Sequence, residues 1–104
     1  IHEAVMTAFR PLPGSNVSRI LCFETPSSSE WQTPAPHLTF TPQYHVDISE
    51  FLELKLRALA AYESEMRDFP HPRSLEGVMH LARWRGAAIG RAAAEAFMVS
   101  RIVA

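Results

Sequence analysis

The side chains best placed to do chemistry in this chain lie in one short stretch, Pro70-His71-Pro72-Arg73-Ser74. The two prolines remove backbone hydrogen-bond donors and restrict the residues before them, so the loop is expected to be stiff. A cation beside a helix N-terminus favours a polar or anionic ligand group. We therefore predict that this loop, through His71, Arg73 and Ser74, holds a polar or anionic ligand group. The alternative is a proline-rich connector whose Arg73 only faces water.

Two helices are predicted to flank this loop. Ser74 precedes an apolar-periodic run and is a candidate N-cap for a helix that continues to about Glu95. Before the loop, the leucine spacing predicts a helix from about Glu50 to Met66. Asp47 or Ser49 is the expected cap of that earlier helix.

The last predicted helix carries a stripe of small residues at every fourth position, Ala82, Gly86, Gly90 and Ala94. Glycine inside a helix costs roughly 1 kcal/mol relative to alanine. Two glycines on one stripe therefore predict that another backbone passes close to this side of the helix.

Three strands and a short first helix complete the expected elements. Residues 1–9 have helical apolar spacing, and Val17–Glu24, Tyr44–Ile48 and Phe97–Val103 read as extended. The continuous apolar run inside Val17–Glu24 favours burial on both faces, which is typical of parallel sheets. The predicted fold is therefore α/β, as the C-terminal part of a Rossmann-like fold with a mostly parallel sheet flanked by helices.

A long proline-rich loop separates the first two predicted strands. The segment from Thr25 to Pro42 has four prolines and little periodicity, and loops of this length are usually functional or disordered. Trp31 and Phe40 argue against simple disorder, because a disordered linker rarely carries such aromatic surface. We expect this loop to pack against another part of the protein.

The overall composition is that of one globular domain or a part of one. The chain has 104 residues, 47% hydrophobic and 20% charged, with a net charge of -1. This balance gives no reason to expect nucleic acid as a partner. One cysteine, Cys22, rules out an intrachain disulfide, and no membrane span or signal peptide is visible. A cytoplasmic location is expected.

Familiar catalytic and metal-binding motifs are missing. None of the five histidines forms a pair at the helical spacing of four residues, and no Cys-x-x-Cys occurs. The serine run 27–29 lacks the context of a nucleophile elbow. The residue types alone therefore predict an α/β piece with one candidate binding loop.

Several stretches, in this order and spacing, resemble the C-terminal half of LmbE-like proteins, the PIG-L family of zinc-dependent N-deacetylases. The resemblance spans essentially the whole chain. It rests on His2–Pro11, Phe23–Ser28 with Glu30-Trp31, Val46–Ser49, Lys55 with Ala58-Leu59, Tyr62–Arg67, Phe69–Ser74, Arg85-Gly86 and Ala94–Phe97.

The resemblance implies a Rossmann-like hydrolase that removes acetyl groups from N-acetylglucosamine-type substrates with a zinc-activated water. The family's His-Pro-Asp-Asp-Glu signature is absent, and the chain starts just after the position of its Asp-His signature. Residues 1–104 are therefore expected to be the C-terminal segment of one deacetylase domain. The zinc ligands are expected to lie outside this segment, which is expected to be inactive alone. His2 is expected near the metal without binding it.

The resemblance also implies roles for this segment. His71 and Arg73 are expected to contact an amide-bearing amino sugar, and the complete protein is expected to be a homo-oligomer in which His71 acts within one chain or across two. An alternative is a non-catalytic oligomerisation or interaction module. A third reading, a small independent enzyme built on His71, His45 and Asp47, is disfavoured because nothing pairs these residues in the sequence.

Overall fold

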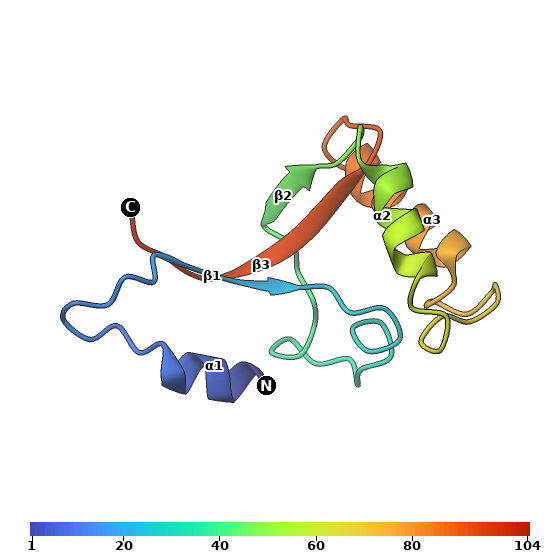
Figure 1. The fold of residues 1–104 in the computed structure, drawn as a ribbon. Coiled ribbons are helices and arrows are strands. Elements are labelled where there is room, and N and C mark those ends of the chain that lie inside the picture. The colour runs from blue at the N-terminus through green and yellow to red at the C-terminus, as the bar shows by residue number, and fades with distance from the viewer.

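The computed structural model describes all of residues 1–104 and contains three helices and three strands (Figure 1). In chain order they are α1 (His2–Ala8), β1 (Arg19–Phe23), β2 (Tyr44–Asp47), α2 (Leu52–Ala60), α3 (Leu75–Ala87) and β3 (Ala94–Ile102). The predicted types and order of the elements are confirmed. The long segment between β1 and β2 contains no helix or strand, as its prolines predicted.

The sheet is antiparallel, so the predicted mostly parallel Rossmann-like sheet is wrong. The strand order is β1-β3-β2, and both outer strands run antiparallel to β3. The reason is visible in the connection between β2 and β3, which contains two helices. A single crossover helix would return the chain for a parallel strand. Because α2 and α3 pack on each other, β3 instead starts where β2 ends, with Asp47 opposite Ala94.

The apolar run in β1 predicted that this strand is buried on both faces, and this prediction is wrong. Ile20 is buried, but Phe23 is 71% exposed, and Leu21 and Cys22 are only half-buried. A strand at the edge of a three-stranded sheet has few neighbours to cover it. Continuous apolar sequence therefore marks an incompletely covered edge here, not a strand enclosed on both faces.

Both central helices are shorter than predicted. α2 ends at Ala60 and α3 at Ala87, and Gly90 takes a positive φ of 70° in the turn that leads to β3. Asp47 does not cap α2, whose N-cap is Phe51. Instead its Oδ1 accepts bonds from the Ser49 amide at 2.9 Å and the Ser49 hydroxyl at 2.5 Å, and these bonds lower the pKa of Asp47.

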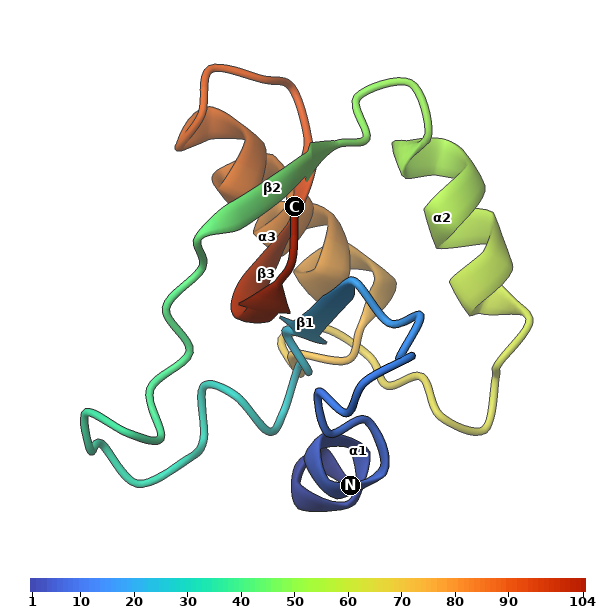
Figure 2. The same ribbon diagram turned by 90° about the vertical axis from the view of Figure 1, so that its left-hand side faces the viewer.

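The small core lies where α3 meets the start of β3. Ile48, Ala82 and Ala93 form its buried cluster, with Leu52 packed against it. At Gly86 a Cβ atom would lie only 2.6 Å from the backbone of Ala93, so the predicted close approach is confirmed at this glycine. Figure 2 shows α3 behind the sheet and α2 beside it.

The molecule is extended. Its principal dimensions are 46 × 29 × 28 Å, and only 8 of 104 residues are buried. Figure 1 shows β1 and the C-terminal part of β3 running away from α2 and α3 as a two-stranded ribbon. No helix combines the length and the apolar character that a membrane span needs.

Candidate functional site

The serine of the predicted site is confirmed as a helix cap. Ser74 is 2% exposed, and its Oγ accepts a hydrogen bond from the Gly77 amide at 2.9 Å at the start of α3. Its extended backbone conformation is the one that N-cap residues adopt. The hydroxyl is therefore already engaged by the fold.

Replacing Ser74 with alanine is expected to destabilise the protein by about 1 kcal/mol. The Gly77 amide would lose its acceptor at a position that water hardly reaches. Urea unfolding followed by circular dichroism measures this change. Ser28→Ala is the control, because Ser28 is exposed and its side chain makes no hydrogen bond. Equal midpoints for the two variants would contradict the capping role.

The other two residues of the loop make local contacts. His71 Nδ1 accepts a hydrogen bond from the Arg73 amide at 3.0 Å, which leaves Nε2 without a partner. Arg73 Nη1 lies 3.5 Å from the Glu65 carboxylate, and Arg73 Nε is buried without a hydrogen bond. The imidazole ring of His71 meets Trp31 edge-on, at 5.5 Å between ring centroids. The structure thus joins the proline-rich loop to the His71 loop, a contact that the sequence did not reveal.

The other four histidines do not form a cluster with one another. His2 and His37 are exposed, and His80 lies 3.3 Å from Glu76 one turn away on α3. His45, on β2, shares no hydrogen bond or ion pair with His71 or with Asp47. The partners of Asp47 are Ser49 and Arg91. No three His, Cys, Asp or Glu side chains lie close enough together to hold a metal ion. The residues present therefore do not fit a zinc site.

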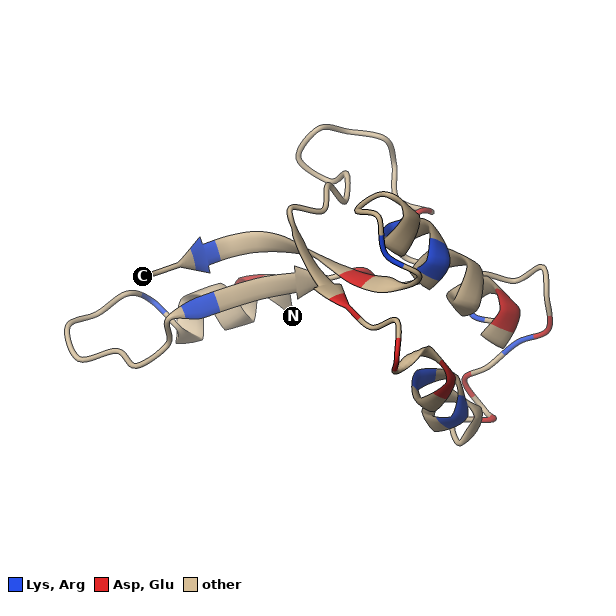
Figure 3. Ribbon diagram, turned by 90° about the horizontal axis from the view of Figure 1, so that it is seen from above, with Lys and Arg blue, Asp and Glu red and all other residues tan.

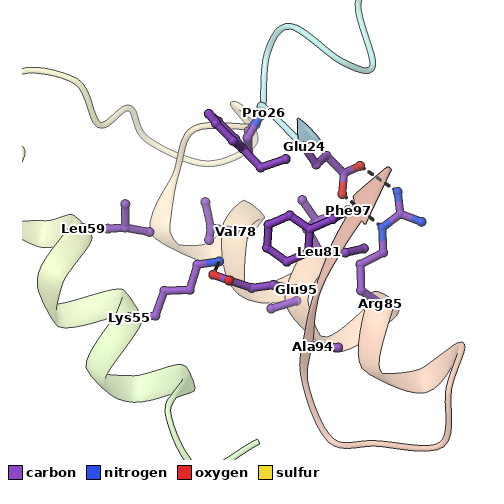
Figure 4. A pocket seen from close by; sticks show the side chains of 13 residues that line it. Glu24, Pro26, Lys55, Leu59, Val78, Leu81, Arg85, Ala94, Glu95 and Phe97 are labelled. Carbon is purple, nitrogen blue, oxygen red and sulfur yellow. Dashed lines mark hydrogen bonds and ion pairs between the residues drawn. The ribbon is translucent and has the colours of Figure 1, made fainter. Parts of the chain in front are cut away.

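A concave site lined by charged and apolar side chains lies elsewhere, between α2, α3 and β3, with a volume of about 410 Å³ (Figure 4). Ligand sites in proteins usually have volumes of about 300–1,000 Å³. The apolar part of its lining comes from these three elements, from the end of β1 and from the start of the proline-rich loop. These side chains include Phe23, Pro26, Leu59, Val78, Leu81 and Phe97.

Two ion pairs form part of the lining of this cavity. Lys55 of α2 donates to Glu95 of β3 at 2.6 Å. Arg85 of α3 donates to both carboxylate oxygens of Glu24, from Nη2 at 2.7 Å and from Nε at 3.1 Å. The Arg85–Glu24 side chains are only 19% and 16% exposed, so water screens this pair weakly.

A second, more polar cavity of about 310 Å³ shares Glu24 and Arg85 with the first. Its other walls come from the proline-rich loop, and they include Ser29, Gln32, Thr33 and Thr39. The Arg85 guanidinium also lies 5.8 Å from the centre of the Phe40 ring. The ion pair thus separates an apolar chamber from a chamber lined with hydroxyl and amide groups.

Sequence reasoning did not assign roles to Glu24, Lys55, Arg85 or Glu95, although all four lie in the stretches that carry the resemblance. One signal was present. A charged residue between apolar neighbours, such as Glu95 within Ala94–Phe97, is rarely buried without a partner. The partners could not be named, because they are 40 and 61 residues away along the chain.

Charge elsewhere on the molecule is mixed. Figure 3 shows basic and acidic positions interspersed over α2, α3 and the loops around them.

Comparison with known proteins gives no match: no protein-family model, no curated protein and no solved structure is significantly similar to this chain.

Proposed function

We propose that this chain is the substrate-recognition part of an LmbE-like zinc-dependent N-deacetylase that acts on N-acetylglucosamine-type substrates. One observation supports the proposal. Four of the eight stretches whose order and spacing carry the resemblance come together in space, because Glu24, Lys55, Arg85 and Glu95 all line the 410 Å³ cavity.

The cavity has the groups that an amino sugar needs. Phe23 and Phe97 offer aromatic surface for the apolar face of a sugar ring or for an acyl methyl group. The Glu95 carboxylate has lone pairs beyond the one used by Lys55 and can accept hydrogen bonds from hydroxyl groups. The Lys55 ammonium keeps two further donors for a carbonyl or hydroxyl oxygen.

In this proposal, residues outside this chain bind the zinc ion. The side chains present do not fit a metal site, so the chain's own residues bind and orient the substrate and take no part in activating water. His71 and Arg73 remain proposed substrate contacts of the complete enzyme. We also propose that the complete protein is cytoplasmic and that it forms a homo-oligomer.

Adding N-acetylglucosamine is expected to shift the backbone amide resonances of residues 94–97 and of Lys55 in nitrogen-edited NMR spectra. Glu95→Gln removes the carboxylate from the cavity and is expected to raise the dissociation constant at least about 10-fold. Glu76→Gln is the matched control, because Glu76 sits in an exposed pair with His80 outside the cavity. Unchanged resonances at residues 94–97, or equal affinity in the two variants, would remove the cavity from substrate binding.

A second candidate function, a non-catalytic interaction module, is favoured by a different observation. Sixteen large hydrophobic side chains are exposed, while six hydrophobic residues form the buried core. Such an excess of apolar surface marks proteins that associate. An absence of sugar binding together with stable self-association would favour this function over the first.

A further inference from the structure

We propose that β1 is the interface through which two copies of this chain associate, with the two β1 strands pairing antiparallel across a two-fold axis. The proposal does not depend on the deacetylase function. It rests on the open edge of β1, on the amount of uncovered surface and on the side chains around that edge.

The outer edge of β1 has no strand beside it. β1 ends the strand order β1-β3-β2, so only one of its two edges is hydrogen-bonded within the chain. Monomeric proteins usually protect such an edge with charges or proline. The run Ile20–Phe23 contains neither. The irregularity in this ladder leaves out Ser100 of β3, so β1 itself stays continuous.

The uncovered area has the size that a homodimer interface needs. The chain exposes 7791 Å², whereas a compact monomer of 11.7 kDa exposes about 5,900 Å². The radius of gyration is 15.5 Å against about 13 Å for a compact domain of this length. The surplus of about 1,900 Å² falls in the range of about 1,000–2,500 Å² that each subunit of an obligate homodimer buries.

Apolar side chains flank β1 at both ends. Phe23, at its end, is 71% exposed, and Ile102 and Val103, beside its start, are 46% and 58% exposed. Phe9 lies near the start of β1, where its carbonyl oxygen accepts a hydrogen bond from Arg101 Nη2 at 2.6 Å. Figure 3 shows the ribbon of β1 and β3 as mostly uncharged. A second copy would therefore cover apolar surface beyond the paired strands.

The charges at the ends of β1 favour self-pairing. Antiparallel pairing brings the start of one β1 next to the end of the other, as a two-fold axis requires. Arg19 is exposed and has no ion-pair partner in its own chain, and Glu24 directly follows the strand. Each Arg19 would then lie beside the end of the partner's β1, where the 16% of the Glu24 side chain that is exposed has lone pairs left after its two bonds from Arg85.

Sedimentation equilibrium of the 104-residue chain at several concentrations tests the proposal, with twice the 11.7 kDa monomer mass expected. Phe23→Lys is expected to raise the dimer dissociation constant at least about 30-fold. Trp84→Lys is the matched control, because Trp84 is 68% exposed on α3. The control is expected to dimerise like the unmodified chain, and circular dichroism checks that both variants stay folded.

Arg19→Glu gives an independent test at the same edge if Phe23→Lys does not fold. It is expected to weaken the dimer, because it puts a carboxylate beside the partner's Glu24. Amide hydrogen exchange of β1 should slow as the protein concentration rises. The proposal would be overturned by a monomer at every concentration or by a dimer that only Trp84→Lys disrupts. Amide exchange in β1 that does not depend on protein concentration would overturn it as well. Sugar binding is read in the unmodified chain at one protein concentration, because Phe23 also lines the cavity, so either proposal can fail alone.

Discussion

Replacing Arg85 with alanine is expected to lower the free energy of unfolding by about 2–3 kcal/mol. Arg85 makes two hydrogen bonds to the Glu24 carboxylate, and both side chains are largely shielded from water. Without the guanidinium, the Glu24 carboxylate would keep its negative charge at a poorly hydrated position. The variant also removes the bond that ties β1 and the proline-rich loop to α3.

Urea unfolding at one fixed protein concentration measures this effect, since self-association would otherwise add to the stability. Arg91→Ala is the control, because Arg91 pairs with Asp47 at 3.2 Å on the surface, with side chains 59% and 47% exposed. It is expected to cost less than about 1 kcal/mol. The double variant Glu24→Gln with Arg85→Met should cost less than Arg85→Ala, because it leaves no charge unpaired. Equal costs for Arg85→Ala and Arg91→Ala would show that burial does not strengthen the Glu24 pair.

Replacing Gly86 with alanine is expected to cost about 2 kcal/mol or more, although alanine favours helix by about 1 kcal/mol. The new methyl group would lie 2.6 Å from the Ala93 amide nitrogen and Cα atom and 2.7 Å from the Arg91 carbonyl oxygen. Those atoms belong to the backbone that leads into β3, so they cannot rotate away. α3 and β3 would have to separate, and the core of Ile48, Ala82 and Ala93 would open.

Gly90→Ala separates steric overlap from backbone strain in the same thermal or urea melts. Gly90 has a positive φ of 70°, but nothing lies within 4 Å of the position of its missing Cβ. Its replacement is expected to cost about 1–2 kcal/mol from conformational strain alone. A stabilised Gly86→Ala variant would mean that α3 and β3 are not in close contact.

Local patterns in the sequence determined the elements and some of their details. Apolar spacing predicted the helices, extended runs predicted the strands, and Ser74 before an apolar-periodic run predicted the cap that the structure shows. Gly86 on a stripe of small residues predicted the close backbone approach. These features depend on residues within one or two turns of each other, so their physics is contained in short stretches of sequence.

Tertiary structure decided the direction of the strands and the composition of the candidate site. The apolar run of β1 fits a buried parallel strand and an exposed antiparallel edge equally well. The choice between them came from the packing of α2 on α3, which sets where β3 begins. The pairs Lys55–Glu95 and Arg85–Glu24 join residues 40 and 61 positions apart. No local pattern encodes such pairs, because a half-buried charge requires some partner but only the folded chain selects which one.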